Sequence, residues 1–354
     1  MSSSFWKKRA PTRSKPTPIP QQAPAPPVAP LPAPVGNMQP IPVTNESDGI
    51  VINRGYSYFS ACWLAPDGTI LTFCGIVGKR PQFFRVELND TITRRGPLLN
   101  YDGEAEGWYF DHGGNVYVCD GPRLKRVNLS TGQYTVALDI SETRPGHDLW
   151  QAHSSDDGRS HSATLRQIAS EGPYPKIGTV VQCGSGRMFY AATGTLDESH
   201  ITADGSYVII KETDEQGRLY NRIVSCADGG DGYRLNPGEA IGHSDCGSDF
   251  IVGEDSQIGA CIRFDPRTRE RRPLFDSWAV GHLSVRGRRC LHTNDTTIRM
   301  IDVETKAITP VCDHGMIGSG YDFQCHANLS PCGRAAAWVS NVAGRMDLYA
   351  CRLT

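Results

Sequence analysis

HANLSPCGRAAAWVSNVAGRMDLYACRL, residues 326–353, is the stretch of the chain that decides its fold. A histidine is followed by a Pro-Cys-Gly turn, an apolar run, a turn around Gly344 and a second apolar run. Short apolar runs bounded by glycine and proline are typical of β-strands joined by turns. The stretch therefore predicts one small antiparallel unit.

The same sequence motif recurs along the chain before this stretch. The six earlier copies begin at Trp63, Tyr109, His153, His200, His243 and His282. A period of about 40–45 residues with four short strands per unit is typical of a β-propeller. We therefore expect an all-β fold, a seven-bladed β-propeller over residues 46–354. The strand near residues 50–52 is expected to pair with the last copy and close the ring.

Residues 1–45 differ in composition from the rest of the chain. They hold 12 of the 24 prolines and five basic residues, but no acidic residue. This composition predicts a disordered, proline-rich N-terminal arm with polyproline-II character. The arm has no apolar h-region, so we do not expect a secretory signal. Two interpretations remain open: a disordered tail, or a tether to a larger protein assembly with residues 5–9 as its anchor.

Charge and hydropathy exclude two classes of partner. The 354 residues carry a formal net charge of −2, whereas a nucleic-acid-binding protein needs a basic stripe. No run approaches the roughly 18 apolar residues that a membrane span requires. The 12 cysteines form no CxxC pair, so we expect buried free thiols and a reducing environment. The expected location is the cytoplasm, or a virion component made there.

Histidine is the residue that recurs at the start of the repeats. Five copies carry it just before the turn, at His153, His200, His243, His282 and His326. Because the first strands of propeller blades face a central channel, these side chains are expected to converge at comparable heights. Each histidine either fills an aromatic slot, as Trp63 and Tyr109 would, or belongs to a cluster that binds metal or titrates.

Three stretches of the second half resemble the oligogalacturonate lyases. They are residues 220–247 (YNRIVSCADGGDGYRLNPGEAIGHSDCG), residues 278–285 (WAVGHLSV) and residues 324–331 (QCHANLSP). The repeat phrase of residues 330–353 is also similar to the repeat of TolB-type propellers. The resemblance implies an intracellular seven-bladed propeller that splits short pectin fragments by β-elimination.

The resemblance also implies roles for individual residues. Arg222 matches a catalytic and substrate-binding arginine, and His243 matches a histidine that acts as general base. His282 and His326 match two metal ligands in a family that uses manganese. Gln324 is expected to complete this divalent-metal site, although the family usually has a histidine at that position. His200 is expected to contact the substrate.

Further departures from the family pattern lie beside these positions. Residues 242–246 read GHSDC where the family has an aromatic-rich GHEFW, and Tyr321 lies roughly where it has a ligand glutamine. The proline-rich arm has no counterpart in the family.

The residue types suit elimination from a uronate. A histidine can remove a proton near neutral pH, a divalent metal can polarise a carboxylate, and arginine can bind one bidentately. One hypothesis is therefore a lyase or related enzyme acting on uronate oligosaccharides. The alternative is a non-catalytic propeller that binds a surface glycan or a protein, tethered by its arm to a larger assembly such as a phage tail adhesin.

Overall fold

The computed structural model describes much of residues 40–354, which belong to one compact unit. The described residues are 40–44, 49–50, 52, 62–65, 70–77, 80–87, 97–100, 108–111, 114–129, 131–168, 176–192, 195–229, 232–236, 239–255, 257–275, 281–294, 296–318 and 325–353. In this part of the chain no helix has the length and apolar character needed to cross a membrane.

The described strands form seven four-stranded antiparallel sheets. Sheet 1 holds β2 (Cys62–Leu64), β3 (Ile70–Val77), β4 (Arg80–Glu87) and β5 (Pro97–Asn100), and sheet 2 holds β6 (Trp108–Phe110), β7 (Asn115–Asp120), β8 (Arg123–Asn128) and β9 (Tyr134–Asp139). Sheet 3 holds β10 (His147–Ser154), β11 (His161–Gln167), β12 (Lys176–Gln182) and β13 (Met188–Ala192), and sheet 4 holds β14 (Thr195–Ile201), β15 (Tyr207–Thr213), β16 (Leu219–Ser225) and β17 (Tyr233–Arg234). Sheet 5 holds β18 (Ile241–Cys246), β19 (Ile251–Asp255), β20 (Ala260–Phe264) and β21 (Arg271–Phe275), and sheet 6 holds β22 (Leu283–Arg286), β23 (Arg289–Thr293), β24 (Thr297–Asp302) and β25 (Ile308–Asp313). Sheet 7 holds β26 (Asn328–Leu329), β27 (Ala335–Ser340), β28 (Asp347–Arg352) and, at its edge, β1 (Ile41–Pro42).

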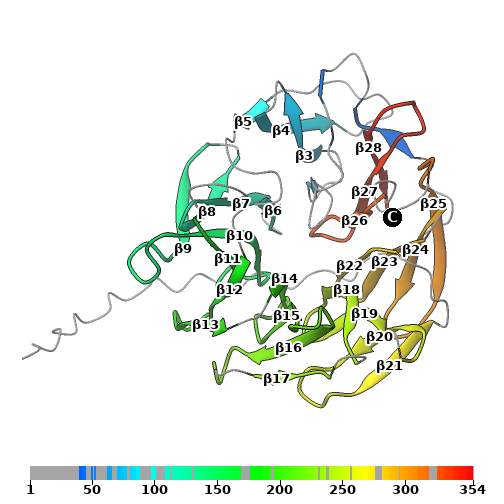
Figure 1. Ribbon diagram of the computed structural model, residues 1–354. Helices are drawn as coiled ribbons and strands as arrows, with labels where there is room; N and C mark the ends of the chain where they lie inside the picture. The colour runs from blue at the N-terminus through cyan, green and yellow to red at the C-terminus, as the bar shows by residue number, and fades with distance from the viewer. Residues whose placement is uncertain are drawn as a thin grey trace, which may run out of the picture. The chain divides into compact units, whose positions relative to one another are not determined.

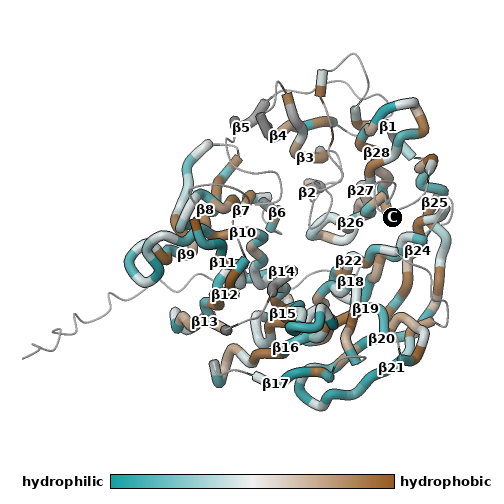
Figure 2. The backbone as a smooth tube through the Cα atoms, in the orientation of Figure 1, coloured by the Kyte–Doolittle hydropathy of each residue, from teal (hydrophilic) through white to brown (hydrophobic). Residues whose placement is uncertain are grey.

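Each hydrophobic cluster of the described core lies between two neighbouring sheets. Ile209 and Ile223 of sheet 4, for example, pack with Ile251 and Ile262 of sheet 5. Equivalent clusters join the other neighbours in turn, including sheet 7 with sheet 1. Figure 1 shows the sheets following one another around a ring, and Figure 2 shows hydrophilic residues on the outer strand β21. The prediction of an all-β propeller is confirmed.

The turn between the first and second strands of a sheet shows why the repeat carries glycine. In sheet 4 this turn contains Asp204 and Gly205, and Gly205 has a φ of +73°. The Asp204 carboxylate accepts a hydrogen bond from the Ser206 N–H at 2.9 Å. Glycine adopts positive φ without the strain that a side chain adds, and aspartate bonds the backbone two residues on. The Asp-Gly phrase therefore marks a tight reversal between two strands.

The strand that closes the ring differs from the predicted one. β1 pairs with β28, and Thr44 Oγ1 donates to Asp347 Oδ1 at 2.8 Å. Ile50 and Ile52 lie outside any strand, and their buried side chains fill the core between sheets 7 and 1. Proline cannot donate to a sheet ladder but is tolerated at an edge. Pro42 in β1 therefore occupies a position that proline accepts.

This closure also moves the boundary of the predicted arm. Residues 41–42 form strand β1 of the sheet, and Val43 and Thr44 are buried, so a boundary between residues 45 and 46 lies too late. Residues 1–39, and with them the predicted disorder and the anchor at residues 5–9, lie outside the described residues. Among the cysteines that the structure describes, all are free thiols and most are buried, as predicted.

Candidate functional site

The innermost strands of the sheets bring the predicted histidines toward the axis of the ring. Neighbouring innermost strands contact one another along the series β6, β10, β14, β18, β22 and β26 (Figure 1). The histidines lie on or just before these strands: His153 in β10, His200 in β14, His243 in β18, His282 before β22 and His326 before β26. The repeat thus places one histidine in each of five consecutive sheets.

A repeated hydrogen bond between innermost strands shows which positions are equivalent. In each case a backbone N–H donates to a side chain of the preceding sheet: Ile201 to His153 Nδ1 (3.2 Å), Val285 to Asp245 Oδ2 (2.7 Å) and Leu329 to Ser284 Oγ (3.0 Å). The three acceptors therefore lie at one level of the ring. His200 directly precedes Ile201 and belongs to the same level. We call these four residues, His153, His200, Asp245 and Ser284, the turn-side level, because the turn to the second strand follows them.

The other three histidines lie one level earlier on their strands. His243 is two residues before Asp245, and His282 is two residues before Ser284. The pairing of β18 with β19 is irregular between Gly242 and Asp245, and His243 has a φ of +41°. His326 has a φ of +44°. We call His243, His282 and His326 the histidine level. The prediction of comparable heights for all five histidines is wrong, because these three lie two residues earlier on their strands than His153 and His200 do. Sheets 3 and 4 carry the same irregularity in strand pairing, so the bulge itself does not cause the difference.

Histidines of three consecutive sheets contact one another at the histidine level. The ring centroids of His243 and His282 are 5.1 Å apart, and those of His282 and His326 are 3.7 Å apart. His326 is 2% exposed, whereas the His243 side chain keeps 29% of its surface accessible. Non-glycine residues with positive φ are strained and cluster at functional sites. The histidine level therefore combines strained backbone, converging imidazoles and one solvent-accessible ring.

A carboxylate from the second strand of sheet 5 faces the accessible histidine. Glu254, in β19, places Oε2 3.0 Å from His243 Nδ1. Its other oxygen, Oε1, is buried and has no hydrogen-bond partner among the residues that the structure describes. Burial of an unpartnered carboxylate oxygen is unfavourable. The second oxygen of Glu254 is therefore kept from solvent at a cost in free energy.

His200 lies in a buried charge network at the turn-side level. Its Nε2 is 3.6 Å from Glu198 Oε2, and its Nδ1 is 3.7 Å from Asp245 Oδ1. Lys211 Nζ approaches Glu198 Oε1 at 3.3 Å. Burial alone would lower the pKa of His200, but the Glu198 and Asp245 carboxylates outweigh it and raise this pKa to about 9. His200 is therefore a buried imidazolium at neutral pH, and its charge is balanced within the protein.

His153 has the opposite electrostatic environment. Burial, followed by the positive charge of His200, lowers the pKa of His153 to about 3. The two rings are 5.5 Å apart. Because Nδ1 of His153 accepts the Ile201 N–H, the proton of the neutral ring lies on Nε2. His153 therefore acts as a neutral connector between sheets 3 and 4.

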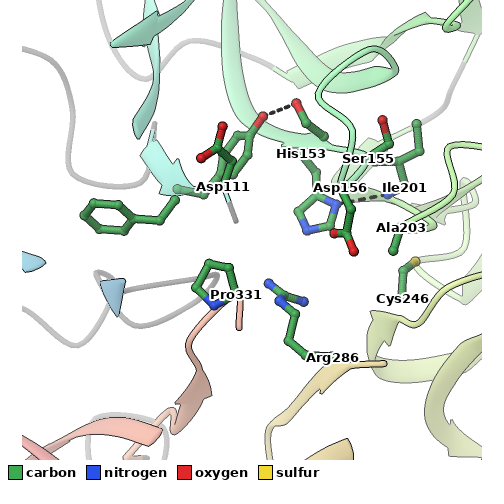
Figure 3. A pocket seen from close by; sticks show the side chains of 12 residues that line it. Asp111, His153, Ser155, Asp156, Ile201, Ala203, Cys246, Arg286 and Pro331 are labelled. Atoms are coloured by element: carbon green, nitrogen blue, oxygen red, sulfur yellow. Dashed lines mark hydrogen bonds between the residues drawn. The ribbon is translucent and has the colours of Figure 1, made fainter. Parts of the chain in front are cut away.

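A pocket lies beside the turn-side level, where residues of sheets 2–7 meet. It is lined by Tyr109, Phe110, Asp111, His153, Ser154, Ser155, Asp156, Ile201, Ala203, Cys246, Arg286 and Pro331. Figure 3 shows the Arg286 side chain reaching toward the space beside His153 and Asp156. Asp111 accepts hydrogen bonds from Arg126 and Asn115, and Arg286 Nη1 lies 3.7 Å from Asp245 Oδ2. Several polar groups of the pocket thus have partners within the protein.

Arg222 does not join the histidines. Its Nε donates to Glu212 Oε1 at 2.9 Å, and Glu212 is fully buried. The preceding residue, Asn221, points toward sheet 5, since its Oδ1 accepts the Ile241 N–H at 2.6 Å. Successive residues of a strand point to opposite faces. The Arg222 guanidinium is therefore directed away from His243, and its role in substrate binding or catalysis stays a prediction.

The predicted metal ligands are only partly described. His282 and His326 lie together, while Gln324 and Tyr321 lie outside the described residues. Within the described ranges, no group of three His, Cys, Asp or Glu side chains is arranged to hold a metal ion. The two histidines supply nitrogen donors that suit first-row metals. They fit part of a divalent-metal site, and a complete one needs further donors.

Sequence reasoning missed three acidic residues of the channel: Glu198, Asp245 and Glu254. Two of them had a detectable signal. Glu198 and Asp245 lie two residues from a predicted histidine on the same strand, and alternation places such residues on the same face. Glu254 could be found only by pairing the hairpin of β18 and β19, which sets it opposite Gly242.

Comparisons with known proteins establish the fold. No protein-family model matches the chain, and no curated protein sequence matches it significantly. A solved oligogalacturonate lyase from Vibrio parahaemolyticus is similar, with a TM-score of 0.65 and 13% identity over 90% of this chain and 94% of the other. An oligogalacturonate lyase in complex with manganese has a TM-score of 0.66 and 16% identity over 90% and 99% of the two chains. A chain of the mitotic checkpoint complex has a TM-score of 0.52 and 11% identity over 96% and 99%.

One propeller architecture thus serves proteins of unrelated function, so its presence does not identify an activity. By structure, the chain is a β-propeller similar to oligogalacturonate lyases at low sequence identity.

Proposed function

We propose that this propeller binds uronate-containing oligosaccharides at the histidine level and cleaves them by β-elimination. The observation that carries the proposal is the contact of His243, His282 and His326 from three consecutive sheets. Two of these residues hold positive φ, which a protein retains only where the surroundings enforce it. The structural likeness to oligogalacturonate lyases supports the substrate class, although it concerns the fold alone.

The proposed reaction needs a base and a way to stabilise negative charge. The base removes the proton α to the uronate carboxylate, and the electron pair forms a carbon–carbon double bond as the β glycosidic oxygen leaves. His243 is the proposed base, because its ring is the accessible member of the histidine level. The leaving oxygen takes up a proton to become the new hydroxyl of the released sugar.

His282 and His326 are proposed as two nitrogen ligands of a divalent metal, such as manganese, with Gln324 as a third donor. Such an ion, when bound, would act as a Lewis acid on the uronate carboxylate. Arg222 is not part of this proposal, because its guanidinium is engaged by the buried Glu212. Nor is His200, because two carboxylates already face it.

The test combines metal analysis with an elimination assay on oligogalacturonates. Wild-type protein should bind manganese and release an unsaturated product that absorbs in the ultraviolet. The double variant His282→Ala/His326→Ala should lose the metal. His243→Ala should keep the metal and lower the rate by about 10²–10⁴-fold. His147→Ala is the matched control, since His147 lies outside both levels and its ring contacts the nearby Pro145 carbonyl.

The outcomes separate the two hypotheses for function. Equal metal content in wild type and in the double variant would rule out the metal site. Oligosaccharide binding without any unsaturated product would exclude the lyase and favour a non-catalytic glycan-binding propeller. Neither the arm as a tether nor an assembly partner is needed for this proposal, and both stay predictions.

A further inference from the structure

The His243–Glu254 pair has the geometry of a carboxylate that orients a histidine. Glu254 lies on β19, directly beside the innermost strand of the same sheet, and its Oε2 is 3.0 Å from His243 Nδ1. The two side chains keep 29% and 11% of their surface accessible. A largely buried carboxylate moves little, so the pair is held on a rigid strand and not on a loop.

The hydrogen bond determines where the imidazole carries its proton. A carboxylate only accepts, so Nδ1 must donate, and the neutral ring then has its lone pair on Nε2. With the opposite tautomer, the lone pair of Nδ1 would face the carboxylate, and Nε2 could not accept a proton. An acidic partner that selects the tautomer is the established way to prepare a histidine as a base.

The backbone adds a second constraint on the same ring. His243 has a φ of +41° within a bulge of β18, and the His282 ring lies 5.1 Å away on the next sheet. Positive φ at a residue with a side chain is strained, because Cβ comes close to the following carbonyl oxygen. The bulge turns His243 toward its neighbours, while Glu254 holds the Nδ1 edge of the ring.

We infer that Glu254 is a positioning residue that keeps His243 in the Nδ1–H tautomer and so leaves Nε2 as the proton acceptor. The inference rests on the proposed function, in which this lone pair takes up the proton.

The tautomer can be measured without any assay of activity. Long-range ¹H–¹⁵N correlation spectra of the full chain distinguish Nδ1–H from Nε2–H imidazole, and the spectrum of His243→Asn assigns the signals. Neutral His243 should be the Nδ1–H tautomer in the wild type. In Glu254→Gln the Nε2–H form should become populated, because an amide can also donate to Nδ1. Glu304→Gln, a carboxylate of sheet 6, is the control and should leave the signals unchanged.

Kinetics on oligogalacturonates then separate positioning from a structural role. Glu254→Gln should lower kcat by about 10²-fold with KM little changed, as expected when only the base is impaired. An Nε2–H tautomer in the wild type, or an unchanged tautomer in Glu254→Gln, would overturn the inference. The wild-type spectrum alone decides this if the variant does not fold. An Nδ1–H tautomer in a protein without lyase activity would refute the proposed function but leave the placement of the proton intact.

Discussion

The two levels of the channel use the same residue type in different ways. At the turn-side level, His153 accepts a backbone N–H from the next sheet, and His200 lies between two carboxylates. At the histidine level, the imidazoles contact one another, and His243 and His326 lie on backbone with positive φ. The first arrangement joins neighbouring sheets, while the second keeps strained backbone beside the solvent-accessible ring of His243. Histidine identity alone therefore does not determine the environment of the side chain, and the level at which the residue lies does.

The largest effect that tests this comparison is expected at Asp245. Asp245→Ala removes the acceptor of the Val285 N–H and a carboxylate that faces His200. Loss of one partner of a buried charge pair is unfavourable by about 3–5 kcal/mol, so the free energy of unfolding should fall by that amount in urea denaturation. Asp249→Ala, at an exposed position in the turn of the same sheet, should change it by less than about 0.5 kcal/mol. A small effect at Asp245 would contradict the structural role of the turn-side level.

The second-largest effect should be the contribution of His200 to the pH dependence of stability. Its folded pKa of about 9 exceeds the usual value of 6.5, so the protonated ring stabilises the fold fully below pH 6.5. This contribution, about 3 kcal/mol, should be lost as pH rises from 6.5 to 9. The groups that face His200 are Glu198, Asp245 and the neutral His153. Between pH 6.5 and 9, the free energy of unfolding should depend less on pH in His200→Asn than in the wild type. An equal dependence in the two proteins would count against the charged imidazole.

The smallest effect concerns backbone strain and separates the levels most directly. The His243→Gly variant should be more stable than the His243→Ala variant by about 1 kcal/mol, because alanine keeps the strain of a φ of +41°. At His200 φ is not positive, so the His200→Ala variant should be more stable than the His200→Gly variant by about 0.5–1 kcal/mol. Thermal unfolding of the four single variants gives both differences. The same sign at both positions would show that strain does not distinguish the two levels.

Local sequence determined the architecture, because every repeat carries its own strand and turn signals. Asp204 and Gly205 at a reversal, followed by the apolar run of β15, predict a hairpin from a few residues, and seven such phrases predict a ring. The convergence of the histidines near the axis also follows from the repeat. These features depend on interactions between residues close together in the chain, which is why they can be deduced from the order of the amino acids.

The tertiary structure alone decided the closing strand, the two levels of the channel and the environment of each side chain. β1 is two residues long and contains a proline, and it forms only because β28, some 300 residues later, offers an open edge. A bulge at His243 shifts the register within its strand, and only the neighbouring sheets fix where that shift lies. Arg222 meets Glu212 across a hairpin. Such outcomes depend on contacts between segments distant in sequence, which no local pattern encodes.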